Sequence, residues 1–285
     1  MTENVELSGL RAVLLCVGWI ASGGQASPLI LPPIPANIID GNDNRGALVD
    51  LGPKLGLTAA EIARIRGVSG HVGCFAPVPK VGSGALFLSN GQILTAAHMF
   101  FDGAARQSKC FFRAQAPGAG WVPLLTDAAN ARFGGTAPKP GSNNDWAVAR
   151  LATPLPGADP FPVDPGVPVA GDRLIVLSAH PEGFETLDPA MPVVEGCAVR
   201  RAPKSSSNTT FYRSDCDASP GSSGGMHLFR EPDGALVFRG MTVSTGPSED
   251  KNLRGAPYDE KAGSVTTALG TNAEILAAGK DLAKQ

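Results

Sequence analysis

From Val68 onward the apolar residues of this chain fall in short runs separated by glycine and proline, and this pattern constrains the fold most. With 35 glycines and 25 prolines among 285 residues, little room is left for long helices. Many short strands joined by Gly- and Pro-rich loops are typical of closed antiparallel sheets, so we predict an all-β fold class. The expected strands are residues 84–89, 92–97, 121–125, 146–151, 173–177, 193–200, 225–229, 235–243 and 264–268.

Asn90 and Gly91 separate the first two of these strands. Both residue types tolerate the positive φ of a type I′ turn, so the pair predicts a β-hairpin that ends near His98. The Pro-rich residues 153–171 indicate a connector between two halves. The predicted layout is one barrel at about residues 68–155, a second at about residues 170–270 and a C-terminal helix at residues 271–283, where Thr271 and Glu274 make a capping box.

The N-terminal part of the chain lacks the strand pattern. Residues 1–26 contain Arg11, then the apolar run AVLLCVGWIA and several small residues, as in a secretory signal peptide cleaved near Ala26. A buried or membrane-anchoring helix is the alternative, but a run of about ten apolar residues is half the length that spans a bilayer. Residues 27–67 are rich in Pro, Gly, Asn and Asp and indicate an extension or pro-segment, with a short helix capped by Thr58 and Glu61.

Charge excludes one class of partner. The formal net charge is −2, with 24 Lys and Arg against 26 Asp and Glu, and the basic residues form no block or stripe. A protein that neutralises a phosphate backbone needs such a stripe, so we expect no nucleic-acid partner.

Three short motifs supply the groups of a nucleophilic site in the order His, Asp, Ser. They are Thr95-Ala96-Ala97-His98, Asn144-Asp145-Trp146 and Pro220-Gly221-Ser222-Ser223-Gly224-Gly225. A serine hydroxyl is a poor nucleophile unless an imidazole takes its proton and a buried carboxylate orients the imidazole. Taken singly, His98 could be a structural histidine, Asp145 a turn residue and the Gly/Ser run an ordinary loop. The occurrence of all three motifs in this order is what favours a catalytic site. The other histidines, His71, His180 and His227, are expected to be structural or exposed.

These motifs resemble those of the chymotrypsin/trypsin-like serine proteases, particularly the compact bacterial members, over about residues 68–283. The resemblance implies two antiparallel β-barrels with the cleft between them. It implies a catalytic triad of Ser223 as nucleophile, His98 as general base and Asp145 as the group that orients it, with the N–H groups of Gly221 and Ser223 as the oxyanion hole.

The resemblance also suggests substrate-binding residues. The segment Val243-Ser244-Thr245-Gly246 is similar to the family segment that pairs with the substrate backbone, so Ser244 and Gly246 are candidates, although Thr245 replaces an aromatic residue. Asp217 lies at the position where trypsin-like members select Arg or Lys. An acid there also occurs in members with other preferences, and beside Cys216 it could be structural.

Export would allow the cysteines to pair. Outside the signal segment there are four, Cys74, Cys110, Cys197 and Cys216, which allow three connectivities or four free thiols. We favour Cys74 with Cys110 and Cys197 with Cys216, because each pair is local to one half. Their spacing does not suit a zinc site.

One residue departs from the vertebrate digestive members, which carry an acid before the nucleophile that pairs with a freshly cut N-terminus. This chain has Ser222 there. We therefore expect Pro220 and the neighbouring disulfide to hold the oxyanion turn, without removal of the N-terminal residues for that ion pair.

The sequence thus predicts a secreted or periplasmic serine endopeptidase that acts on protein or peptide substrates, uses no metal or organic cofactor and is not inserted in a membrane after signal cleavage. A protein inhibitor is a further partner that such a cleft could bind. The alternatives are a catalytically silent homologue that binds proteins and a purely structural β-domain.

Overall fold

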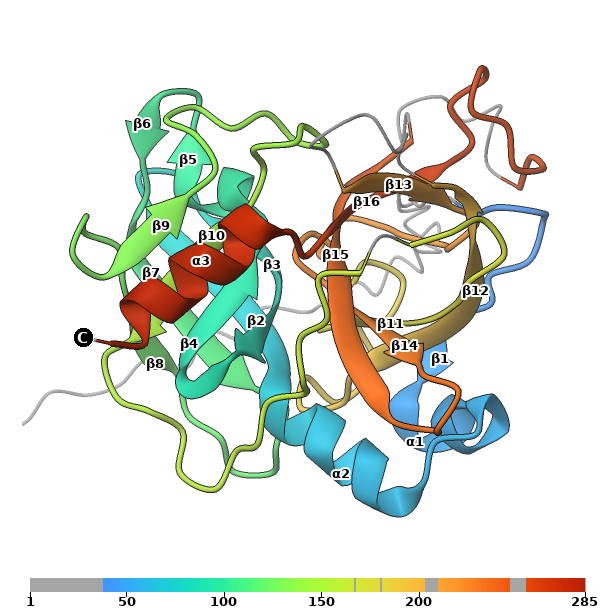
Figure 1. Ribbon diagram of the computed structural model, residues 1–285, viewed down its shortest axis with the longest axis horizontal. Helices are drawn as coiled ribbons and strands as arrows, with labels where there is room; N and C mark the ends of the chain where they lie inside the picture. Colours follow the sequence, from blue (N-terminus) through green and yellow to red (C-terminus); the bar gives the residue numbers. More distant parts are fainter. Residues whose placement is uncertain (1–37, 167, 180, 203–209, 247–254, 285) are drawn as a thin grey trace, which may run out of the picture. The chain divides into compact units, whose positions relative to one another are not determined.

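The computed structural model describes residues 38–284, apart from residues 167, 180, 203–209 and 247–254. The strands form two antiparallel sheets, each of which closes on itself (Figure 1). The predicted signal segment, residues 1–26, lies outside the described residues. Within the described ranges, no helix is long and apolar enough to cross a membrane.

The first sheet is a six-stranded barrel, because β10 pairs with β8 on one side and with β4 on the other. A short strand, β9, pairs with the first residues of β10 on the same side as β8, and β5 and β6 form a separate small hairpin. In chain order the strands are β2 (Ser69–Ala76), β3 (Lys80–Phe87), β4 (Ser89–Thr95), β5 (Phe101–Asp102), β6 (Ala105–Arg106), β7 (Ser108–Ala114), β8 (Val122–Leu125), β9 (Ala131–Phe133) and β10 (Ala147–Leu151).

The second sheet closes in the same way through the pairing of β12 with β13, and β1 (Gly46–Ala47) is added to the outer edge of β12. The barrel strands are β11 (Arg173–Ser178), β12 (Val193–Arg201), β13 (Phe211–Ser214), β14 (Met226–Arg230), β15 (Leu236–Thr245) and β16 (Thr266–Gly270). The prediction of two antiparallel barrels is therefore confirmed.

Residues before the first barrel are folded against the rest of the molecule. After β1 come α1 (Leu48–Leu51), the 3₁₀ helix η1 (Gly52–Leu55) and α2 (Ala59–Val68). The capping box predicted for α2 is confirmed, since Thr58 Oγ1 accepts from Glu61 N and the Glu61 carboxylate accepts from Thr58 N. Leu48 and Ile65 are fully buried in the main core. Part of the segment predicted as an extension thus contributes to that core.

One apolar core extends through both barrels. Phe87 of β3 and Phe238 of β15 meet edge to face with ring centroids 5.9 Å apart. Both favoured disulfides are formed: Cys74 of β2 with Cys110 of β7, and Cys197 of β12 with Cys216 after β13. Each bridge is internal to one barrel.

The hairpin between β3 and β4 forms, but the predicted type I′ turn at Asn90 and Gly91 is wrong. Neither residue has a positive φ, whereas Leu88 has φ +62°, and Phe87 pairs with Ser89. Asn90 is instead held by the connector: Leu155 N donates to Asn90 O at 2.9 Å and Asn90 Nδ2 donates to Leu155 O at 3.0 Å. These tertiary contacts override the local turn preference.

The C-terminal helix α3 (Ala273–Leu282) is present, but its predicted cap is one residue too early. Asn272, not Thr271, accepts from Ile275 N, because the Thr271 hydroxyl donates to Asp164 O at 2.9 Å. Among the described strands, the sequence prediction missed seven: β1, β2, β5, β6, β7, β9 and β13. The last two are only 3 and 4 residues long, and β7 places charged and apolar residues in alternation on a half-exposed face.

Candidate active site

Strand register in the first barrel brings His98 and Asp145 together. Ala147 at the start of β10 is opposite Thr95 at the end of β4. Because the strands are antiparallel, the residues just after β4 and just before β10 lie at the same end of the barrel. His98 belongs to the 3₁₀ helix η2 (Ala97–Phe100) that follows β4, and its Nδ1 lies 2.8 Å from Asp145 Oδ2.

The Asp145 carboxylate is fully buried and accepts three hydrogen bonds. Besides the imidazole, its donors are His98 N, 2.9 Å from Oδ1, and Gly141 N, 3.1 Å from Oδ2. A buried carboxylate with several donors holds its partner in one orientation. Here that partner is an imidazole whose Nδ1–H points at the carboxylate, which leaves Nε2 as the basic nitrogen.

Two successive tight turns carry Ser223. Ser222 N donates to Ser219 O at 2.9 Å and Gly225 N donates to Ser222 O at 2.8 Å. The third residues of these turns, Gly221 and Gly224, have φ of +94° and +83°, which glycine adopts without strain. Among the described residues, the N–H groups of Gly221 and Ser223 donate to no acceptor. Two free N–H groups beside a serine are what an oxyanion hole requires.

Ser83 of β3 connects this turn to both barrels, and it was not among the site residues predicted from the sequence. Ser83 N donates to Ser223 O at 2.7 Å, and the Ser83 hydroxyl donates to Gly221 O at 2.7 Å while accepting from Ala179 N at 2.9 Å. The contact with the turn is close, since a Cβ at Gly224 would lie 2.0 Å from Ser83 O. A serine in a barrel strand carries no sequence signal of such a role.

The His98 and Ser223 segments meet at Gly82. A Cβ there would lie 2.8 Å from Met99 Sδ and 2.9 Å from Ser223 O, so the residue after His98 and the Ser223 turn both contact this glycine. In the described part of the chain, no hydrogen bond joins the Ser223 hydroxyl to His98 Nε2. The bond between nucleophile and base is often long in the absence of substrate.

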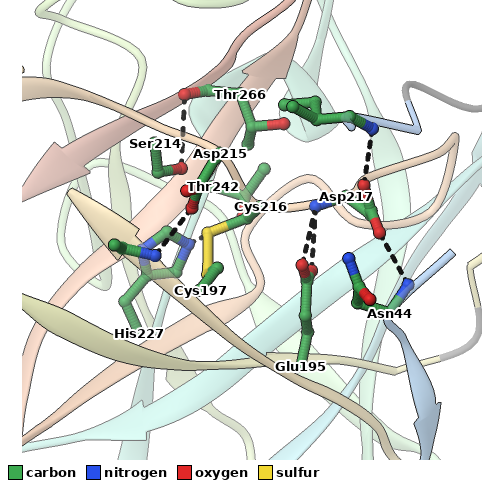
Figure 2. The surroundings of a disulfide bond; sticks show 12 residues. Asn44, Glu195, Cys197, Ser214, Asp215, Cys216, Asp217, His227, Thr242 and Thr266 are labelled. Atoms are coloured by element: carbon green, nitrogen blue, oxygen red, sulfur yellow. Dashed lines mark hydrogen bonds between the residues drawn. A yellow bond between two sulfur atoms is a disulfide. The ribbon is translucent and has the colours of Figure 1, made fainter. Parts of the chain in front are cut away.

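Asp217 is placed differently from the other candidates. It is 3% exposed, and its two oxygens accept from Ile39 N at 2.7 Å and Asn44 N at 2.8 Å (Figure 2). Its own N–H donates to the buried Glu195 carboxylate. Burial raises the pKa of Asp217 to about 6, and burial together with the charge of Asp217 raises the pKa of Glu195 well above its usual range.

The segment predicted to pair with substrate lies at the end of β15. Ser244 is half-buried and contacts the Asp145 loop, because a Cβ at Gly141 would be 2.9 Å from Ser244 Cβ. Gly246 N donates to Val265 O at 2.7 Å. Ser244 thus lies near the loop that carries Asp145, whereas the Gly246 N–H already donates to Val265 O.

The remaining histidines differ in their surroundings. His227 is fully buried, with Nδ1 2.6 Å from the Tyr212 hydroxyl and Nε2 2.8 Å from Thr242 Oγ1, and burial lowers its pKa to about 3. His71 Nε2 lies 2.8 Å from Pro189 O. His180 lies outside the described residues. Across the residues that are described, no group of three or more His, Cys, Asp or Glu side chains is arranged to hold a metal ion.

Two closed six-stranded barrels followed by a C-terminal helix define the chymotrypsin-like class of folds. A family comparison agrees with this class: residues 82–237, more than half of the chain, match the trypsin-like peptidase domain. The chain belongs to this family, as the sequence motifs predicted.

Solved structures show the same fold at low sequence identity. A Glu endopeptidase in complex with MPD has a TM-score of 0.62 at 12% identity and covers 87% of this chain and 100% of its own. The protease Anisep from Arthrobacter nicotinovorans has a TM-score of 0.55 at 14% identity, covering 76% and 96%. An inactivated protease paralogue from the scabies mite has a TM-score of 0.56 at 15% identity, covering 78% and 97%. A comparison with curated proteins found no match.

Proposed function

We propose that this protein is an exported serine endopeptidase that cleaves protein or peptide substrates through an acyl-enzyme on Ser223. The observation that carries the proposal is the His98–Asp145 pair, in which a buried carboxylate orients an imidazole across 2.8 Å. A histidine held in this way, next to a serine turn in which the N–H groups of Gly221 and Ser223 donate to no acceptor among the described residues, is equipped for acyl transfer.

In the proposed reaction, the Ser223 hydroxyl attacks the scissile carbonyl while His98 Nε2 takes its proton. The Asp145 carboxylate stabilises the imidazolium that forms, and the N–H groups of Gly221 and Ser223 bind the developing oxyanion. His98 then returns the proton to the leaving amine, which departs with the C-terminal part of the substrate. Water, activated by the same imidazole, hydrolyses the ester and restores the Ser223 hydroxyl.

Two features support an extracytoplasmic location. Both disulfides are formed, and such bonds persist in oxidising compartments. The composition of residues 1–26 is that of a signal peptide. Export of the chain and cleavage of this segment are parts of the proposal.

A catalytically silent homologue that binds proteins in the same cleft is the second candidate. It is favoured by the missing hydrogen bond between Ser223 and His98 in the described structure and by the similar fold of an inactivated paralogue. The retained His98–Asp145 pair weighs against it, since a binding module has no need for an oriented base.

Covalent labelling with an organophosphonate probe distinguishes the two candidates. The full chain should be labelled, with the adduct found on Ser223 by peptide mass spectrometry, and Ser223→Ala should abolish it. Ser222→Ala is the matched control, because it removes the adjacent hydroxyl and should leave the adduct on Ser223. A folded protein that shows no labelling would support the silent homologue.

A further inference from the structure

The first residues that the structure describes cross two loops of the second barrel. We call residues 38–45 the N-terminal strap. On one side, Gly255 N donates to Ile38 O at 2.6 Å, Asp40 N donates to Ala256 O at 3.0 Å, and Tyr258 N approaches Asp40 Oδ1 at 3.3 Å. The strap is therefore attached to the loop that precedes β16.

On its other side the strap is attached to Asp217, which lies six residues before the proposed nucleophile. Figure 2 shows Asp217 with its backbone nitrogen facing Glu195 and one carboxylate oxygen facing Asn44 N. The other carboxylate oxygen accepts from Ile39 N. These bonds join residues 178 and 173 positions apart in the chain. A buried carboxylate that loses such donors is left with an unmet charge, so this connection strongly favours the attached strap.

Arg45 at the end of the strap reaches the nucleophile turn itself. Its Nη1 donates to Ser219 Oγ at 2.7 Å, and its guanidinium is held by Asp43, with Nη2 2.8 Å from Oδ2. The guanidinium also lies over the Phe184 ring, 5.1 Å from its centroid. Ser219 is the first residue of the turn, since its carbonyl accepts from Ser222 N. The Arg45 side chain is 3% exposed, which makes it part of the interior.

We propose that the N-terminal strap is a permanent part of the active enzyme, in which Asp217 and Arg45 are positioning residues that hold the oxyanion turn in shape. This inference rests on the proposed function and extends it. In this proposal the N–H groups of Ile39 and Asn44 and the guanidinium of Arg45 hold the turn in shape. In the vertebrate digestive members, an ion pair made by a newly cut N-terminus has that task. The turn then needs no freed amino group near Val68, and cleavage there would release the strap from the chain and weaken the turn.

The same geometry bears on substrate preference. Both oxygens of Asp217 already accept backbone N–H groups, so the carboxylate is not presented to a substrate side chain. We infer that Asp217 does not select Arg or Lys at the cleavage site. Its effect on catalysis should appear in kcat for every substrate and not in the preference among substrates.

The test compares Asp217→Ala with Asp164→Ala in the full chain. Asp164 is a matched control because it is also an acid of the second half that accepts a backbone N–H, from Gly166, and pairs with Arg239, yet it does not contact the strap. Loss of a whole oxyanion donor costs about 100- to 1,000-fold, so a displaced turn should lower kcat by about 10- to 100-fold in Asp217→Ala. Asp164→Ala should keep kcat, and KM should change little in either variant.

A second pair of variants tests the strap without touching Asp217. Asn44→Pro removes the N–H that donates to Oδ2, whereas Asn42→Pro places a proline at an exposed strap residue whose N–H donates to no described acceptor. Organophosphonate labelling should slow in Asn44→Pro and not in Asn42→Pro, at a temperature where circular dichroism shows both to be folded.

The outcomes separate the two proposals. If the unaltered chain is not labelled on Ser223, the proposed function fails. If the unaltered chain is labelled and Asp217→Ala reacts equally fast, the strap inference fails alone. It also fails if Asp217→Ala loses activity only toward substrates with Arg or Lys, because the residue would then determine specificity.

Discussion

Replacing Ser83 by alanine tests whether a barrel strand holds the turn that contains the proposed oxyanion donors. The residue is 2% exposed, and its hydroxyl makes two hydrogen bonds, a partly buried one to Gly221 O at 2.7 Å and a buried one from Ala179 N at 2.9 Å. Losing both and leaving two backbone groups unpaired should lower the free energy of unfolding by about 2–4 kcal/mol. Gly221 O belongs to the peptide group next to the Gly221 N–H, which is a proposed oxyanion donor. Because loss of the Ser83 hydrogen bond should displace that donor, kcat should also fall, by about 10-fold.

Urea unfolding measures the first effect, and kcat on a peptide amide, at a temperature where the variant is folded, measures the second. Ser214→Ala is the matched control, since that buried hydroxyl makes one long contact, 3.4 Å from Thr266 O, and does not touch the turn. It should cost under about 1 kcal/mol and leave kcat unchanged. Equal stability and equal kcat in the two variants would refute the argument.

Three further predictions follow from the geometry. Asp145→Asn removes the carboxylate that holds the His98 imidazole in its tautomer, so kcat should fall by about 10⁴-fold with KM nearly unchanged. A loss in kcat of less than about 10-fold would exclude an orienting role for Asp145. The pKa of buried His227 is about 3, below its unfolded value, so unfolded chains bind the extra proton and the contribution of this histidine to stability should fall by about 3 kcal/mol from pH 7 to pH 4. The raised pKa values of Asp217 and Glu195 act in the opposite direction, so the histidine contribution is measured as the difference between parent and variant. His227→Gln should flatten that loss in urea titrations at the two pH values, and an unchanged slope would contradict it. Joint replacement of Cys74 and Cys110 by alanine opens a loop with a separation of 36 residues and should lower the free energy of unfolding by about 3–4 kcal/mol. A thermal unfolding midpoint equal to that of the parent would disprove this.

Local patterns accounted for much of the fold. The strands at 173–177 and 193–200 became β11 and β12 with small changes at their ends, because short runs of apolar residues bounded by loops already specify a buried strand. The Thr58 capping box also formed, since its donors and acceptors are three residues apart. The two disulfides followed from the even cysteine count and their locality within each half.

Errors arose where distant contacts compete with local preference. Asn90 is bonded to Leu155, 65 positions away, and so does not make the turn that its neighbour Gly91 favours. Thr271 gives its hydroxyl to Asp164 O, 107 positions away, and leaves the cap to Asn272. In both cases the polar side chain does form hydrogen bonds, but its partner is a distant backbone group and not the local one that the sequence pattern predicted.

The sequence by itself determined the chemical groups of the site and the period of the strands that carry them, because residue identity and alternation are local properties. Only the tertiary structure decided which groups meet. The register of β10 against β4 brings His98 to Asp145, and the path of the N-terminal strap leads Ile39 and Asn44 to the carboxylate of Asp217. A buried acid takes the donors that folding brings to it, and those donors lie far away along the chain.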